Sequence, residues 1–245
     1  MQKKLTLLMV LLLTLSYTFA AFRLDVEAGA AFSGYNDARI PGDGEATKFS
    51  LSEDLKSDPA FASRFNFHYW LNEQHRLSFL IAPLKITPEG RFDSDVLFQG
   101  ETFAAGEDIS AVYRFDSYRL QYRYYFRNQD LLIKGIGASL KLRDAEISLE
   151  SAELRAKKTN TGFVPLLNLE LAYDFSPEFS LIVDAEGLWS PYGRAADVLT
   201  SINYVLDDRF TIFAGYRLLE GGSDGDEVYT FALINYAVLG LRIDF

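Results

Sequence analysis

Hydrophobic and polar residues alternate along most of the chain with a period of two. In the first run, every second residue from Phe22 to Phe32 is apolar, while Arg23, Asp25 and the residues in phase with them are polar or small. This period indicates β-strands with one apolar and one polar face, because amphipathic helices repeat every 3.6 residues. The same alternation continues towards Phe245 without an intervening linker. We therefore predict one all-β domain.

The turn residues between these runs predict about ten strands. Four connections are short and polar (LNEQHR, FRNQDL, DFSPEF and LDDRF), and they alternate with five longer ones. Short turns on one side and longer loops on the other are typical of bacterial outer-membrane barrels, whose strand number is even. Because TKFSLSED would make the total odd, we assign it to a surface loop, although other groupings give eight or twelve strands. The expected strands are 22–35, 61–71, 76–87, 110–126, 131–150, 162–175, 179–189, 196–206, 209–220 and 228–245.

Residues 1–20 have the pattern of a secretory signal peptide. Lys3 and Lys4 precede an apolar run from Leu5 to Leu15, and a small residue, Ala20, ends the segment. The run is shorter than the roughly 20 apolar residues of a membrane-spanning helix. We expect cleavage after Ala20 and a mature domain of residues 21–245.

Composition narrows the function further. The chain has no cysteine, so it holds neither a disulfide framework nor a thiolate metal site. After removal of residues 1–20, the chain has 22 lysines and arginines and 34 aspartates and glutamates, which gives a net charge of −12. Such a polyanion is not a general nucleic-acid binder. We predict no cofactor and no nucleic-acid partner, and the oligomeric state stays open.

The last residues carry a motif with a known parallel. Gly240, Ile243 and Phe245 match the C-terminal signal of bacterial outer-membrane proteins, in which a glycine, two residues, a hydrophobic residue, one residue and a terminal aromatic follow one another. The position two before the glycine departs from the pattern, because it is Val238 rather than polar. The chain thus resembles small outer-membrane β-barrel proteins, without pointing to a subfamily.

The resemblance has consequences for fold and partners. It implies a transmembrane antiparallel up-and-down β-barrel in the bacterial outer membrane. It also implies contact with outer-membrane lipid and lipopolysaccharide, and assembly by the barrel-assembly machinery.

A soluble lipocalin-like barrel is the structural alternative. In that fold the apolar faces line a ligand cavity, and alternation alone does not say which face is inside. The polar faces here mix small residues with charges, as from Gly135 to Arg143, which suits a water-filled lumen better than a ligand pocket. Aromatic residues near strand ends, such as Tyr122 and Phe126, favour membrane girdles.

An outer-membrane enzyme acting on lipid or peptide is the functional alternative. Such hydrolases typically use a histidine beside a carboxylate or serine. The chain has only His68 and His75, both expected near the periplasmic end, where His68 would bond Asn66 or an arginine. No G-x-S-x-G or H-E-x-x-H motif occurs. We therefore predict that the protein is not an enzyme.

Two loop motifs are candidate binding sites. GGSDGDEVY offers acidic oxygens for calcium but lacks the rest of a calcium loop, which favours a solvated hairpin tip. RAKK at 155–158 suits lipopolysaccharide phosphates, but four residues are weak support, which favours a solvated loop.

The polar faces place opposite charges on opposite walls of the lumen. Pairing across FRNQDL sets Arg119, Gln121 and Arg123 opposite Gly135, Gly137 and Ser139. Across DFSPEF, Asn168 and the neighbouring carboxylates form an acidic wall. The basic residues of the predicted network are Arg64, Arg119, Arg123, Lys141, Arg143 and Arg217. Its acidic residues are Asp25, Glu27, Glu170, Asp184 and Glu186.

Such walls allow two outcomes. In a narrow barrel they pair into a plug or frame a polar constriction for small solutes. The sequence therefore predicts a structural or channel-like outer-membrane barrel with a mostly closed lumen.

Overall fold

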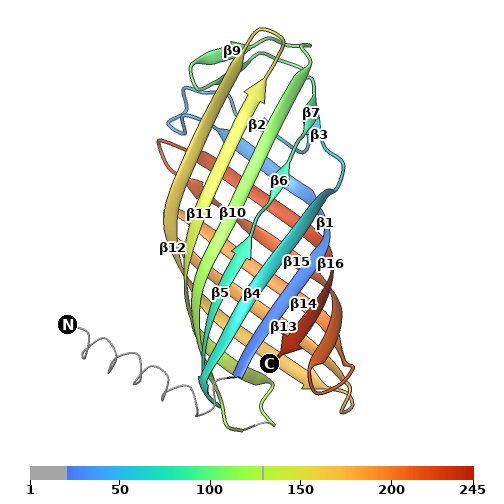
Figure 1. Cartoon of the computed structure of the whole chain (residues 1–245). Helices are drawn as coiled ribbons and strands as arrows, with labels where there is room; N and C mark the ends of the chain where they lie inside the picture. The colour runs from blue at the N-terminus through green and yellow to red at the C-terminus, as the bar shows by residue number, and fades with distance from the viewer. Residues whose placement is uncertain (1–20, 129) are drawn as a thin grey trace, which may run out of the picture.

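The alternating segments form a barrel of ten antiparallel strands that closes on itself (Figure 1). The computed structural model describes residues 21–128 and 130–245, so the predicted signal peptide lies outside the described residues. Each strand pairs with its neighbour in sequence, and β1 pairs with β16 to close the ring. The barrel strands are β1 (Ala21–Arg39), β4 (Ala60–Asn72), β5 (His75–Ala82), β10 (Ile109–Tyr125), β11 (Ile133–Glu150), β12 (Arg155–Asp174), β13 (Phe179–Ser190), β14 (Gly193–Val205), β15 (Phe210–Asp224) and β16 (Tyr229–Asp244).

The predicted count of ten strands is confirmed, but several strands are longer than expected. β12 begins at Arg155 rather than at residue 162, because the RAKK segment continues the ladder with β11. Two of the five longer connections, SPYGRA between the strands expected at 179–189 and 196–206 and EGGSDGDE before the last one, are likewise ends of the hairpins β13–β14 and β15–β16. One strand is shorter than expected. The strand predicted at 76–87 is interrupted at Pro83, which has no N–H to donate.

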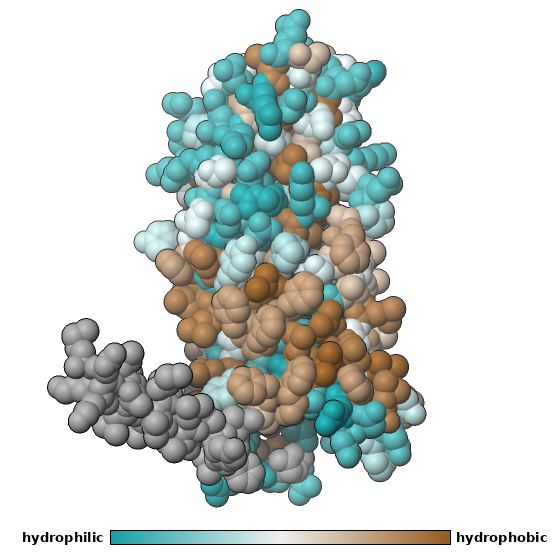
Figure 2. All heavy atoms as spheres, in the orientation of Figure 1, coloured by the Kyte–Doolittle hydropathy of each residue, from teal (hydrophilic) through white to brown (hydrophobic). Residues whose placement is uncertain are grey.

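On the face seen in Figure 2, apolar side chains gather in a belt across the lower part of the barrel. Phe61 and Leu239 are 77% and 68% exposed on it, whereas polar residues face the lumen. Tyr118, Leu142 and Phe163 follow one another in register and mark the outer border of the belt, because the next outward residue on β10, Asp116, is polar. The lipocalin-like alternative is therefore wrong, since its apolar faces would point inward. No helix among residues 21–128 and 130–245 is long and apolar enough to cross a membrane.

Two long connections fold together into a cap on the outer end of the barrel. The cap comprises residues 40–59 and 83–108, and its buried core includes Phe49, Phe98 and Phe103. Leu97 N and Thr47 Oγ1 join the two segments at 3.0 Å. TKFSLSED lies in the cap, as predicted, and contributes no spanning strand. The short cap strands are β2 (Phe49–Ser50), β3 (Leu55–Lys56), β6 (Lys85–Ile86), β7 (Glu89–Gly90), β8 (Val96–Phe98) and β9 (Glu101–Phe103).

The residues of the predicted assembly motif lie on β16 and just after it. Gly240 faces the lumen against the ring of Phe213, which leaves no room for a side chain. Ile243 pairs with Leu24 of β1, and the backbone N–H of Phe245 donates to Phe22 O at 2.9 Å. These contacts help close the barrel, and their recognition by the assembly machinery stays a prediction.

The register between β10 and β11 leaves space for long inward side chains. Arg123 pairs with Gly137 and Gln121 with Ser139, but Arg119 pairs with Lys141 rather than with a small residue, which corrects the predicted register. A Cβ atom added to Gly137 would lie 1.9 Å from Tyr122 O. A backbone atom cannot rotate away from such a contact, so Gly137 is required at this position.

We expect Gly137→Ala to lower the stability of the barrel by about 1–3 kcal/mol, because the backbone must shift to accept the methyl group. Gly162→Ala is the matched control on β12, because its nearest added contact is Arg143 Nη2 at 3.6 Å. The measurement is the temperature at which the folded band is lost in unboiled gels. Equal melting of the two variants would contradict this explanation of Gly137.

Candidate functional site: a charge network in the lumen

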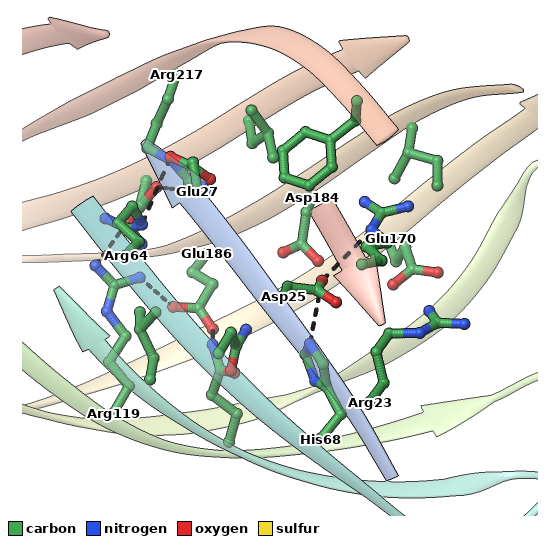
Figure 3. Close-up of a pocket in the computed structure, with 18 of the residues that line it drawn as sticks. Arg23, Asp25, Glu27, Arg64, His68, Arg119, Glu170, Asp184, Glu186 and Arg217 are labelled. Carbon is green, nitrogen blue, oxygen red and sulfur yellow. Dashed lines mark hydrogen bonds and ion pairs between the residues drawn. The ribbon is translucent and has the colours of Figure 1, made fainter. Parts of the chain in front are cut away.

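A network of ion pairs, several of whose members are labelled in Figure 3, fills the periplasmic half of the lumen. Its central carboxylate is Asp197 on β14. Asp197 accepts hydrogen bonds from Arg217 at 2.5 Å, Arg119 at 2.6 Å and Arg64 at 2.9 Å. Arg217 comes from β15, next to β14, whereas Arg119 and Arg64 come from the distant strands β10 and β4, so one carboxylate connects separate parts of the wall. All four side chains are buried.

Two further carboxylates complete this upper layer. Arg217 binds Glu27 with two hydrogen bonds of 2.9 and 2.6 Å. Glu186 accepts from Arg119 at 2.5 Å and from Ser139 at 2.7 Å. Bidentate and charge-assisted bonds of this kind are the strong ones in proteins. These hydrogen bonds therefore compensate the buried negative charge of both carboxylates.

A second layer lies nearer the periplasmic end and is built around Arg123. Its guanidinium donates to Asp184 at 2.7 and 3.0 Å and to Glu170 at 2.7 Å. The Tyr125 hydroxyl donates to the same Glu170 oxygen at 2.8 Å. Arg123 lies on β10, and the two carboxylates on β12 and β13, so these contacts also cross the lumen.

Asp25 and His68 form a separate contact beside these layers. Asp25 lies 3.3 Å from His68 Nε2 and 3.4 Å from Arg242 Nε. His68 Nδ1 is 2.7 Å from Ser78 Oγ, so its partners are a serine and an aspartate rather than the expected Asn66 or arginine. The three side chains have the order of a Ser–His–Asp triad, but Ser78 is 4% exposed and does not line the cavity beside them.

Nine of the eleven predicted network residues make ion pairs in the lumen: Arg64, Arg119, Arg123, Arg217, Asp25, Glu27, Glu170, Asp184 and Glu186. Lys141 and Arg143 do not join them. Lys141 lies over the ring of Phe115, 4.5 Å from its centroid, and Arg143 donates to Asn160. Both lie towards the outer end, above the carboxylates.

Sequence reasoning missed Asp197, together with the arginines of the lower layer, Arg23, Arg76 and Arg242. The available signal was alternation along β14, where Asp197 is in phase with the buried polar residues Ser201 and Asn203. That phase places Asp197 on the polar face, and hence in the lumen. Its central role depends on which strands lie opposite, which alternation does not show.

The two loop motifs weighed as binding sites contact each other at the outer end. Lys158 Nζ lies 2.5 Å from Glu227 Oε1, and this hydrogen bond holds the pKa of Glu227 below its usual value. Among the described residues, no group of three or more histidine or acidic side chains is placed to hold a metal ion. The contact shows that one lysine of RAKK already has an acidic partner within the chain.

We expect Asp197→Asn to destabilise the barrel by about 3 kcal/mol or more, because breaking a buried pair leaves uncompensated charge in a low-dielectric interior. Asp208→Asn, in an exposed periplasmic turn, removes the same charge and serves as the control. Heat- or urea-driven loss of the folded gel band measures both. A melting point shared by Asp197→Asn and the control would show that the network contributes little stability.

No protein-family model matches the sequence, and no curated protein matches it. Among solved structures, the outer membrane protease OmpT of Escherichia coli aligns with a TM-score of 0.55 at 8% identity, covering 94% of this chain and all of OmpT. Ail, the attachment invasion locus protein of Yersinia pestis, aligns with a TM-score of 0.41 at 11% identity over 91% of this chain and 99% of Ail. At these identities a likeness concerns the fold alone. The closed barrel with its outward apolar belt has the architecture of a bacterial outer-membrane β-barrel protein, and the likeness to OmpT supports this fold.

Proposed function

We propose that this protein is a closed structural barrel whose lumen admits at most small polar solutes, and that any ligand contacts are made at its outer end. The observation that carries this proposal is the cross-lumen pairing centred on Asp197. Guanidinium groups from three strands meet one carboxylate at 2.5 to 2.9 Å. Such contacts leave no continuous water path between the groups that make them.

The space that remains beside the network supports the same conclusion. The cavity there has a volume of about 90 Å³, which is room for only a few water molecules. Among the described residues that line it, six are arginines and six are carboxylates. Balanced charge makes an open, ion-selective pore unfavourable, because a selective pore lines its constriction with one sign of charge.

A hydrolase is the second candidate, because Ser78, His68 and Asp25 stand in the order of a catalytic triad. A working triad needs its nucleophile within reach of substrate. Ser78 is buried between the wall and His68, and the cavity beside it is lined by charged side chains. We therefore propose that these three residues stabilise the lumen rather than catalyse a reaction.

In planar-bilayer recordings, the wild-type protein is expected to show little or no steady conductance. Replacing Glu170 and Asp184 together by alanine removes both carboxylate partners of Arg123, so this variant is expected to leak ions or to melt earlier. Glu73→Ala combined with Asp208→Ala, both in exposed turns, controls for the change in net charge. A large, stable, ion-selective conductance of the wild type would make the protein a porin and overturn the proposal.

Purified protein is expected to give no turnover of lipid A, phospholipid or peptide substrates that depends on His68. The test compares wild type, His68→Ala and Ser78→Ala after each has been shown to fold by its gel mobility. Hydrolysis by the wild type that disappears in both variants would show instead that the protein is a hydrolase.

A further inference from the structure

A second and larger cavity lies above the charge network, at the outer border of the apolar belt. Its volume is about 400 Å³, within the range of pockets that bind small organic ligands. Its lining is mostly apolar and includes Phe115, Val164, Leu188, Leu219 and Ile234. Lys141, at its inner end, pairs in register with Arg119 of the network, so the network forms the floor of this cavity.

The charged groups around the cavity fall into two classes. Four already have partners of opposite charge: Arg194 and Glu220 lie 2.8 Å apart, Lys158 lies 2.5 Å from Glu227, and Glu146 lies 3.7 Å from Arg114. Lys141 and Arg143 are different, because no carboxylate within the described part of the chain lies within ion-pair distance of either. Lys141 is 3% exposed and lies over the face of Phe115, and Arg143 Nε is buried without a hydrogen-bond partner.

A buried cation without an anion is costly, and the cost is reduced when an anion binds beside it. The two unpaired cations line the same cavity as the apolar side chains. A ligand that pairs with these cations and packs against the apolar side chains has one anionic group and an apolar body.

The wall of the barrel is open beside this cavity. β12 and β13 pair from Asp174–Ser180 only as far as Leu167–Gly187, and above that point β12 pairs with β11 alone in the described structure. Ala172 N donates to Leu132 next to β11, so the odd-numbered residues of β12, including Pro165, direct their backbone groups towards β13. Pro165 has no N–H, which removes a donor where the pairing stops.

This opening is lined by Phe163, Pro165 and Leu188, which also line the cavity. Phe163 marks the outer border of the belt and is 70% exposed. An apolar body inside the cavity can therefore reach the interface of the outer leaflet through the wall.

We propose that the outer cavity is a binding site for a single-chain organic anion, whose head group pairs with Lys141 and Arg143 and whose apolar chain lies between Phe115 and Leu188 towards the gap between β12 and β13. The site goes beyond the closed-lumen function, because it requires only the outer half of the barrel. A conducting wild type would overturn the closed lumen and leave the binding result standing by itself.

The test uses radiolabelled decanoate and the full barrel in phosphatidylcholine nanodiscs, with empty nanodiscs as background. Wild type is expected to bind decanoate saturably, with one molecule per barrel. Lys141→Met is expected to weaken binding about tenfold or more, because it removes a charge-assisted contact in a low-dielectric site. Lys157→Met, on the exposed side of β12, is expected to bind within twofold of wild type.

Two further arms test the ligand chemistry and protect against misfolding. Decan-1-ol, which lacks the charge, and acetate, which lacks the chain, are expected to displace decanoate poorly. Leu188→Trp fills the cavity without touching the cations and is expected to block binding even if Lys141→Met fails to fold. The proposal is overturned if binding does not exceed that of empty nanodiscs, if folded Lys141→Met or Leu188→Trp binds like wild type, or if decan-1-ol competes as well as unlabelled decanoate.

Discussion

The structure depends on one electrostatic constraint: charges that face the inside of a narrow barrel must be neutralised where they stand. The side chains of the charge network are buried, so little water reaches them to screen their charges. Asp197 meets this constraint with three arginines, and Arg123 meets it with two carboxylates. Because most of these partners come from strands that are not neighbours in the sheet, neutralising the charges also ties separate parts of the wall together and narrows the passage.

This constraint divides the lumen into two regions with different chemistry. Below Arg119 the charges are matched and little space remains. Above it, Lys141 and Arg143 have no carboxylate, the lining becomes apolar, and the β12–β13 ladder ends below Pro165. The matched region is suited to rigidity, whereas the unmatched region has the composition of a binding site. The two cations that fail to join the network are therefore the ones that give the outer cavity its proposed specificity.

Much of the architecture follows from sequence, because alternation and turn residues are local signals. They predicted ten strands, the belt and most inward-facing charges, including Glu27, Arg119 and Asp184. They did not predict the partners, because contacts across a lumen depend on strand tilt and stagger, which shift each strand along its neighbour. For this reason Asp197 was missed, and Lys141 and Arg143 were placed in a network that lies below them. The cap was also missed, since its buried Phe49 and Phe98 depend on contacts between two distant loops.

The central claim is that charge pairs across the lumen hold the barrel together, and a double-mutant cycle on Arg119 and Glu186 tests it most directly. The side chains are 2.5 Å apart and come from β10 and β13. Unfolding free energies of wild type, Arg119→Met, Glu186→Gln and the double variant give their coupling, and the exposed cap pair Arg91–Asp108 provides the reference. We predict a coupling of about 2 kcal/mol or more for the lumen pair and below about 1 kcal/mol for the exposed pair. A lumen coupling no larger than that of the exposed pair would contradict the account.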